Sequence, residues 1–435
     1  MRESASSASV CCCKKGQAKH LSNRLDNAMA GDVRQINRRR VLEVLLAHLD
    51  EGVTQPAIEE ATRLSRSSVS AILRDLQPVM RPENGSIPLA PSRGGRPARL
   101  FHLSEDFGAI GIEFGRTHVR VGVQRLTGQE PDEGEILSRE NLDIDVPREP
   151  DPALDLAAEL VDSLLSRPRA PSAIAGVCIA LAAPVNTDGR VRMGPFQAWS
   201  DLDLGSELVE RLGHGMRSSP KTPRVLIDND ANLALRAELR WGAARGVANA
   251  IYLKWSAGIG AASCVNGVVI RGHGGVGGEI GHTKVSDAGT DAKCEWCHRH
   301  CLESVASLGA LGVSAAELAA IAIDSSHPQR ARIEREVEDA AALVGSTLAA
   351  TVNALNPRLV IVGGLCPELF PDAALGPLRS TIEGSVFPPI ARDMRICPSI
   401  QKRGSGLVGT FATVIDELVP DYLLSVAENR AFAGL

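Results

Sequence analysis

The sequence of 435 residues has few aromatic residues and no long apolar run. Phe, Trp and Tyr make up only 3% of the chain while hydrophobic residues make up 44%, so the core must consist mainly of Ala, Val, Leu and Ile. No apolar run approaches the roughly 20 residues that cross a bilayer, and no apolar N-terminal segment resembles a secretion signal. We therefore expect a cytoplasmic protein without a membrane partner, and two or three domains for this length.

A strong net charge is also missing, but the charge is unevenly distributed. The net charge is −5 overall, with +6 in residues 1–100 and −11 in the remainder. A basic N-terminal region on an acidic body indicates a polyanionic partner. A solvated basic tail would give the same pattern, so charge alone does not decide between them.

A secreted disulfide framework is absent, although the chain has ten cysteines. Cys11–Cys13 are consecutive in a Ser-rich leader, where adjacent cysteines favour neither a disulfide nor a single metal ion. We interpret that run as incidental thiols. Only Cys294, Cys297 and Cys301 are clustered at a spacing typical of metal ligands.

Residues 1–30 lack hydrophobic periodicity and predict a disordered leader. Residues 31–104 predict three helices, of which the second can be capped by Thr54 and the third by Ser65. Two helices joined by a tight turn form a helix-turn-helix. The third helix has a polar face suited to a DNA groove and its phosphates. That face consists of Arg66, Ser67, Ser68, Ser70 and Arg74.

After the third helix, the sequence predicts two short strands around an arginine-bearing tip. The strands are expected at 87–90 and 99–103, and Arg93 and Arg96 lie on the Gly-rich tip between them. Such arginines can enter a narrow minor groove, where the negative potential is enhanced. Another small helical bundle could supply the three helices, but helices and wing together favour a winged helix-turn-helix that binds DNA.

From residue 105 onward, strands alternate with helices, which indicates an α/β architecture. Strands are expected at 107–114, 118–124, 174–181, 224–227, 251–254, 261–265, 268–270 and 359–362, and helices at 153–165, at 231–239 and within 302–350. We divide this part into a first lobe, 105–228, completed by a C-terminal helix at about 412–435, and a second lobe, 229–411. A Pro- and acid-rich stretch near 129–152 is expected to be a loop.

Three glycine turns follow predicted strands, at 115–117, 256–260 and 363–364. Backbone N–H groups of such turns can hold a phosphate. The residues predicted for this role are Gly115, Thr117, Gly258 and Gly260. Single glycine turns are common in hairpins, so only their combination points to a phosphate site.

Asn229 and Asp230 directly follow a predicted strand. Ligands bind at the carboxyl ends of strands in open α/β sheets. Asp230 could accept a proton from a ligand hydroxyl, while Asn229 could bond a neighbouring one. Capping of the helix at 231–239 by Asp228 or Asn229 is the alternative interpretation.

One histidine and three cysteines predict a structural Zn²⁺ site. The predicted ligands are His282, Cys294, Cys297 and Cys301. His298 and His300 are alternative ligands, and free thiols in a reduced cytosol are the alternative to any metal. Zinc here would orient Glu279 and His282 toward a ligand.

These motifs, in this order, resemble the ROK family of repressors, open reading frames and sugar kinases. The resemblance covers residues 33–420, and the segments that carry it are Leu64–Ser70, Gly94–Ala98, Asn229–Asn232, Gly278–His282 and Cys301–Glu303. It implies a two-lobed actin-like ATPase (ribonuclease H-like) sugar-kinase fold with a cleft, a sugar or sugar derivative as effector, and a homodimer or homotetramer. It also implies that the sugar is held by Asn229, Asp230, Glu279, His282 and Glu303. In a kinase, Asp230 would be the catalytic base.

The chain departs from the family pattern at three places. The first phosphate loop of family kinases reads D-x-G-G-T, whereas Glu113–Thr117 reads E-F-G-R-T, which would crowd a nucleotide's phosphates and Mg²⁺. The family knuckle reads C-x-C-x4-C, and here the middle cysteine is shifted by one position. The segment Pro195–Trp199 lacks the asparagine that often contacts sugar.

We therefore predict a sugar-sensing repressor that binds an operator in double-stranded DNA and has lost kinase activity. The alternative is a hexokinase- or glucokinase-like enzyme, dependent on ATP and Mg²⁺, with an appended DNA-binding domain. A third option is an activator or a constitutive DNA binder whose cleft is vestigial.

Overall fold

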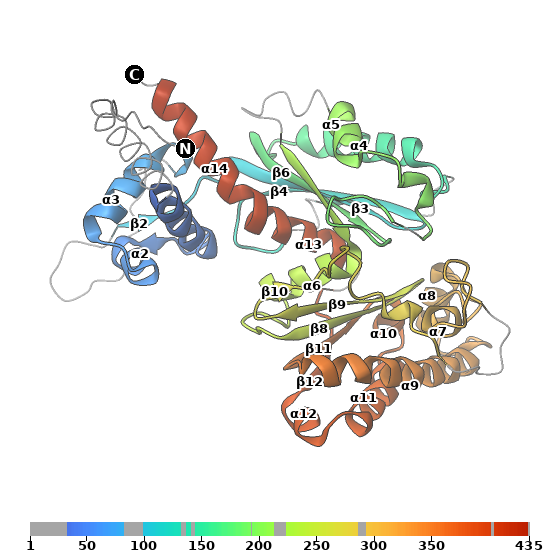
Figure 1. The fold of residues 1–435 in the computed structure, drawn as a ribbon. Coiled ribbons are helices and arrows are strands. Elements are labelled where there is room, and N and C mark those ends of the chain that lie inside the picture. The colour runs from blue at the N-terminus through green and yellow to red at the C-terminus, as the bar shows by residue number, and fades with distance from the viewer. Residues whose placement is uncertain are drawn as a thin grey trace, which may run out of the picture. The chain divides into compact units, whose positions relative to one another are not determined.

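The computed structural model describes residues 33–81, 99–131, 136–140, 144–192, 194–212, 223–285, 293–401 and 404–433. Tertiary contacts divide the chain into two compact units (Figure 1). The first comprises Met1–Ser104 with Leu423–Leu435, and the second comprises Glu105–Tyr422. The predicted leader and the wing arginines Arg93 and Arg96 lie outside the described residues. None of the described helices is long and apolar enough to span a membrane.

The first unit contains a helix at 33–47, α2 (Gln55–Thr62) and α3 (Arg66–Asp75), followed by the short 3₁₀ helix η1 (Gln77–Val79). The apolar residues at helical spacing form its core. They include Val41, Leu42, Leu45, Ile58, Val69, Ile72 and Leu73. Because these residues come from all three helices, burial of one shared core holds the helices together.

The predicted helix caps are present in the structure. The hydroxyl of Thr54 accepts a hydrogen bond from the N–H of Ala57 (3.4 Å), and that of Ser65 accepts one from Ser68 (3.2 Å). Arg63, between α2 and α3, has a left-handed backbone with φ of 56°. A residue in this conformation after a helix ends it within one residue, so α3 can begin three residues later.

A small sheet accompanies these helices. β1 (Val53–Thr54) pairs antiparallel with β2 (Leu100–Phe101), and a bridge joins Met80 to Leu103. The strand predicted at 99–103 therefore exists in shortened form, and its observed partner precedes α2. The other predicted strand, 87–90, lies outside the described residues.

The second unit contains two five-stranded sheets, of which the first has the order β5-β4-β3-β6-β7. Its strands are β3 (Phe107–Phe114), β4 (His118–Arg125), β5 (Ile136–Glu140), β6 (Ala173–Leu181) and β7 (Arg224–Asn229). β5 falls in the stretch that we expected to be a loop. One face packs against α4 (Pro150–Leu165) and α5 (Leu204–Arg211), near the 3₁₀ helix η3 (Gln197–Trp199). The opposite face packs against α13 (Ser405–Thr413).

The second sheet has the order β10-β9-β8-β11-β12. Its strands are β8 (Ala250–Trp255), β9 (Ile259–Val265), β10 (Val268–Val269), β11 (Leu359–Gly363) and β12 (Arg395–Pro398). One face packs against α6 (Asp230–Arg240), and the other against α9 (Arg330–Leu355) and α11 (Pro371–Ser385) (Figure 1). Shorter helices complete this half: η4 (Ile280–His282), α7 (Leu302–Ala306), α8 (Ala315–Ile323), α10 (Leu365–Leu369) and α12 (Pro388–Asp393).

The two sheets share one topology. In each, the first strand in the chain pairs antiparallel with the second, the second pairs antiparallel with the third, and the fourth is parallel to both the first and the fifth. The second unit is thus a mixed α/β fold of two related halves, and the α/β architecture is the one that the alternation of strands and helices predicted.

Helix α13 lies between these halves, and glycines allow its close approach. A Cβ atom on Gly409 would lie 1.8 Å from the carbonyl oxygen of Leu233 in α6, and one on Gly111 of β3 would lie 2.0 Å from Oγ1 of Thr410. We expected the completing helix at about 412–435. The helix on the first sheet begins at Ser405 and continues through the π-helical turn η5 (Val414–Leu418) into α14 (Val419–Ala433), and Leu423–Leu435 groups with the first unit.

Candidate functional site

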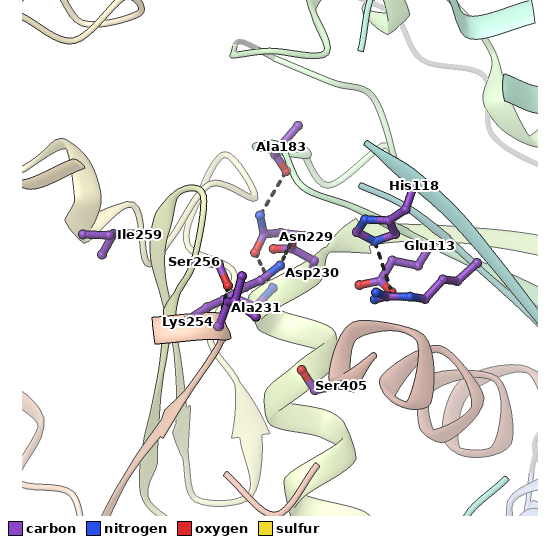
Figure 2. Close-up of polar contacts among 12 residues, drawn as sticks. Glu113, His118, Ala183, Asn229, Asp230, Ala231, Lys254, Ser256, Ile259 and Ser405 are labelled. Carbon is purple, nitrogen blue, oxygen red and sulfur yellow. Dashed lines mark hydrogen bonds and ion pairs between the residues drawn. The ribbon is translucent and has the colours of Figure 1, made fainter. Parts of the chain in front are cut away.

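A direct strand-to-helix junction positions Asn229 and Asp230. β7 ends at Asn229 and α6 begins at Asp230, so no loop intervenes. Oδ1 of Asn229 accepts a hydrogen bond from Ala231 N–H (2.9 Å), and its amide nitrogen donates to the carbonyl oxygen of Ala183 (3.1 Å) (Figure 2). Asn229 therefore caps α6, in agreement with the capping interpretation, and also fixes the segment after β6.

Asp230 forms an ion pair with Lys254 of β8 (Figure 2). The Asp230 residue is 6% exposed and lies in the first turn of α6. Burial alone would lower the pKa of Lys254, but the charges of Asp230 and Glu113 raise it above its ordinary value. Lys254 is therefore a permanent cation next to the candidate base.

Glu113, near the end of β3, is a second buried carboxylate (6% exposed) with cationic neighbours. Its Oε2 lies 3.0 Å from Nη1 of Arg120 and 3.8 Å from Nε2 of His118 (Figure 2). Burial alone would raise the pKa of Glu113, but the nearby imidazole of His118 and the charges of Arg120 and Lys254 lower it well below its usual range. Glu113 is therefore ionised and paired within the protein.

The side chain of Glu303 links the first glycine turn, at 115–117, to the second, at 256–260. Oε2 of Glu303 accepts a hydrogen bond from the N–H of Ile259 (3.0 Å), and its Oε1 lies 3.8 Å from Nη2 of Arg116. A Cβ on Gly258 would lie 2.8 Å from Oε2 of Glu303 and 3.8 Å from Nη2 of Arg116. The Arg116 guanidinium thus lies over the Gly258 turn.

The second and third glycine turns are joined by a hydroxyl. Oγ of Ser256 accepts a hydrogen bond from the N–H of Leu365 (2.8 Å). Gly364 has φ of 103°, and a Cβ there would lie 2.4 Å from the carbonyl oxygen of Trp255. The structure therefore brings these two predicted turns together, while Thr117 of the first turn is exposed to solvent.

Glu279 precedes the 3₁₀ turn η4, and His282 is its last residue. Nε2 of His282 is 3.9 Å from Oε2 of Glu279, whereas its Nδ1 faces Cys294 (3.6 Å) and Cys301 (3.8 Å). Burial, together with the charges of Glu303 and Asp230, raises the pKa of Glu279 to about 7. Glu303 and Asp230 are therefore near neighbours of Glu279.

The four predicted metal ligands converge. One ligand atom from each of His282, Cys294, Cys297 and Cys301 lies within 4.8 Å of every other. Bonds of about 2.3 Å to sulfur and 2.0 Å to nitrogen put tetrahedral zinc ligands about 3.6 Å apart, which agrees with the 3.6 Å and 3.8 Å separations of His282 Nδ1 from two sulfur atoms. The cluster can hold a metal ion, and His298 and His300 do not belong to it.

Most of the polar face predicted on α3 is exposed. Arg66, Ser67, Ser68 and Arg74 are exposed, whereas Ser70 is half-buried. The amide of Gln55 donates to the Ser70 hydroxyl (2.8 Å) and to the carbonyl oxygen of Arg66 (3.2 Å). Ser70 therefore also helps to fix α3 against α2.

Two residues of this site, Lys254 and Arg271, were not predicted from the sequence. Lys254 interrupts the apolar strand β8, and that interruption was the available signal. Arg271 was also missed; its Nη2 lies 3.4 Å from Oδ1 of Asp228, an atom that also accepts a hydrogen bond from Asn232 (2.9 Å). No pattern near Arg271 indicates this contact, because its partners come from β7 and from the turn at Asn186.

Two kinds of known protein, repressors and sugar kinases, are similar to this chain. The xylose repressor of Bacillus spizizenii is 25% identical over 401 residues, covering 89% of this chain and 97% of the repressor. The glucokinase of Thermotoga maritima is 26% identical over 337 residues, covering 71% of this chain and 98% of the kinase.

Among solved structures, a ROK family transcriptional regulator described as a homologue of the E. coli MLC protein superimposes with a TM-score of 0.70. It covers 91% of this chain and 99% of its own, at 21% identity, and so shows a shared fold. The ROK family model matches residues 109–417, which is more than half of the sequence. The chain therefore belongs to the ROK family.

Proposed function

We propose that this protein is a sugar-responsive transcriptional repressor whose winged helix-turn-helix binds DNA. The observation that carries the proposal is the extent of the repressor match. A match over 89% of the chain is longer than residues 105–435 can supply, so the similarity extends into the first unit, whereas the glucokinase match covers 71%. Three relatives whose matches extend this far are xylose repressors.

The surface of α3 supports DNA binding. Its exposed face carries Arg66 and Arg74 around short hydroxyl side chains, and Ser65 and Arg63 set its start. Short polar groups fit between base edges, while arginines bind guanines or phosphates. Arg93 and Arg96 would add minor-groove contacts from the wing.

The cleft supports a polyhydroxylated ligand. Asp230, Glu279 and Glu303 offer carboxylate oxygens that accept hydrogen bonds from hydroxyls, while Asn229 has a second amide hydrogen and His282 an Nε2 atom on the cleft side. We propose these five residues as the sugar site. Xylose is the first sugar to test, because the relatives with full-length matches are named for it.

We propose Zn²⁺ as the ion of the Cys3His cluster. Three thiolates and one imidazole are the donor set that zinc prefers in closed structural sites. When bound, the ion would supply a tetrahedral crosslink between residues 294–301 and His282. Because Nδ1 of His282 faces the sulfur atoms, its Nε2 keeps a hydrogen to donate toward Glu279 or a sugar.

Regulation would be a shift between two populations. A sugar that binds one arrangement of the cleft better than another favours that arrangement. If two copies of the chain associate, this shift changes the spacing of their α3 helices relative to two half-sites. The homodimer or homotetramer and the cytoplasmic location are part of this proposal.

The test is capture of DNA by the purified full-length chain. Genomic fragments of the source organism would be selected for binding, and the best fragment titrated in increasing salt with and without xylose, glucose and other neutral aldoses. We expect selective binding that one sugar releases. Arg74→Ala should weaken binding at least about 10-fold, and a lost phosphate contact lowers the salt slope by about 1.

The matched control is Arg392→Ala, which removes an exposed arginine of α12 in the second unit and should leave DNA affinity unchanged. Equal affinity for every fragment and for random competitor would refute the proposal. Selective binding that no sugar alters would leave DNA binding intact but remove the sensing role.

A further inference from the structure

We propose that Lys254 and Arg116 are internal cations that replace the Mg²⁺–nucleotide of a kinase, so that the cleft takes an uncharged sugar and excludes ATP. The inference rests on the proposed function and names the ligand class of the same site. It follows from a disagreement between the residues of the cleft and the nucleotide that the sugar-kinase-like fold would hold.

Lys254 places a positive charge next to Asp230, the candidate base. It stands in β8 between the buried side chains of Leu253 and Trp255, and its ammonium is paired with Oδ2 of Asp230. One oxygen of the Asp230 carboxylate is therefore already engaged by an ammonium group. The carboxylate can accept a hydrogen bond from a sugar hydroxyl, which needs no proton transfer.

Glu113 is already paired within the protein and is a poor ligand for a metal ion. Its Oε2 is bound by Arg120 at 3.0 Å, and a Cβ on Gly406 of α13 would lie 2.9 Å from its Oε1. One carboxylate oxygen is therefore paired with a guanidinium, and the other lies close to the backbone of α13. Mg²⁺ requires near-octahedral oxygen coordination, which this surrounding does not offer.

Arg116 fills the space in which phosphates would meet the glycine turns. Its guanidinium lies over Gly258 and faces Oε1 of Glu303 at 3.8 Å. The hydroxyl of the same turn, on Ser256, is already bonded to Leu365 N–H. A phosphate would have to displace the arginine from its carboxylate before it could reach the turn.

The charges of the cleft are balanced within the protein. Four cations face four carboxylates, in the pairs Lys254–Asp230, Arg120–Glu113, Arg116–Glu303 and Arg271–Asp228. Among the described residues, no lysine or arginine lies within 4.0 Å of Glu279, the remaining carboxylate. An anionic ligand would therefore meet paired cations and one extra acid, whereas hydroxyl groups can bond to all of these side chains.

The first experiment is calorimetric titration of the full-length chain with Mg²⁺–AMPPNP, a non-hydrolysable ATP analogue. We expect no saturable binding up to 5 mM, in a preparation that binds its DNA fragment. Saturable binding that ATP competes for would overturn the inference. Because DNA binding and sugar release are measured on the same sample, that outcome would leave the proposed function standing.

The second experiment is a double-mutant cycle of Lys254→Met and Asp230→Asn, followed by thermal unfolding and by the same titration. Each single variant leaves a charge unbalanced, so the double variant should be more stable than the sum of the single losses predicts, by about 10-fold in the unfolding equilibrium. Strictly additive losses would show that Lys254 does not balance Asp230.

Two further variants keep this test decisive. Lys254→Arg preserves the charge, so it should retain the stability and the exclusion of nucleotide even if Lys254→Met folds poorly. Arg392→Met removes an exposed cation elsewhere and should change neither measurement. Loss of nucleotide exclusion in Lys254→Arg would also contradict the inference.

Discussion

The two halves of the second unit have the same strand order but opposite charges at equivalent positions. Glu113 is the next-to-last residue of β3, and Lys254 is the next-to-last residue of β8, the corresponding strand of the other sheet. The charge of Lys254 is near enough to lower the pKa of Glu113. The repeated topology has thus placed a carboxylate, Glu113, and an ammonium group, Lys254, near the ends of corresponding strands, where their opposite charges attract.

The carboxylates and the Cys3His cluster differ in how their polar groups are satisfied. The carboxylates Glu113 and Asp230 find cations within the protein. In the second half, the thiols of Cys294, Cys297 and Cys301 converge on His282 and on one another. Converging thiols and an imidazole can hold an external ion, whereas the two carboxylates are paired within the protein.

The largest effect on stability should come from the Cys3His cluster. Cys301→Ser should abolish stoichiometric metal binding and lower the apparent free energy of unfolding by about 4 kcal/mol or more, because metal binding and folding are coupled. Metal content measured by mass spectrometry and the unfolding midpoint test this. Cys397→Ser, at a half-buried cysteine outside the cluster, should keep the metal; metal retained by Cys301→Ser would contradict the assignment.

The next largest effect is expected at the Glu113–Arg120 ion pair, when one of the two charges is removed. Arg120→Met leaves the buried Glu113 without its nearest guanidinium (3.0 Å), which should cost about 3 kcal/mol at pH 7. Glu113 has a lowered pKa in the folded protein, so its contribution is present above its unfolded pKa of about 4.3 and is lost as the pH falls below that value.

The difference between wild type and Arg120→Met should therefore shrink between pH 6 and pH 3.5 in urea titrations. Arg332→Met is the control, since it removes only an exposed pair with Glu336 and should cost less than about 0.5 kcal/mol. A difference that stays constant with pH would show that Arg120 acts through packing and not through charge.

A smaller effect on stability is expected where Gly406 of α13 lies close to Glu113 and Asp230. A Cβ on Gly406 would lie 2.9 Å from Oε1 of Glu113 and 3.4 Å from Cβ of Asp230, so Gly406→Ala should cost about 1–2 kcal/mol by overpacking. Gly376→Ala on α11 meets no atom within 4 Å and should stabilise its helix by up to about 1 kcal/mol. Equal effects of the two changes on thermal unfolding would refute the contact.

The smallest effect on stability is expected at Arg116. Its side chain is 39% exposed and 3.8 Å from Glu303, so Arg116→Ala should change the free energy of unfolding by less than about 1 kcal/mol. Thermal unfolding measures this directly. A loss above 2 kcal/mol would mean that Arg116 is structural, and that the two halves depend on it for cohesion.

Features set by neighbouring residues could be predicted from the sequence. Thr54 and Ser65 cap their helices, and the apolar segments at 107–114 and 174–181 form β3 and β6, because capping and strand burial depend on a few adjacent side chains. The Cys3His cluster was also predictable, since three ligands lie within eight residues of one another.

Features set by distant partners could not be predicted. β5 has too little apolar pattern to stand out from the acidic stretch around it, and its pairing with β4 decides its conformation. β1 is two residues long and needs Leu100–Phe101 to exist as a strand. Lys254 was visible as a charge in an apolar strand, but its partners Asp230 and Glu113 come from other elements.

The absence of a loop between β7 and α6 has a consequence for how the sequence can change. β7 pairs in the first sheet, while α6 packs Ala231, Ala234 and Leu235 against the second. One residue inserted between Asn229 and Asp230 would turn α6 by about 100° about its axis. Its apolar face would then miss the second sheet, so this junction should tolerate replaced side chains far better than any change of length.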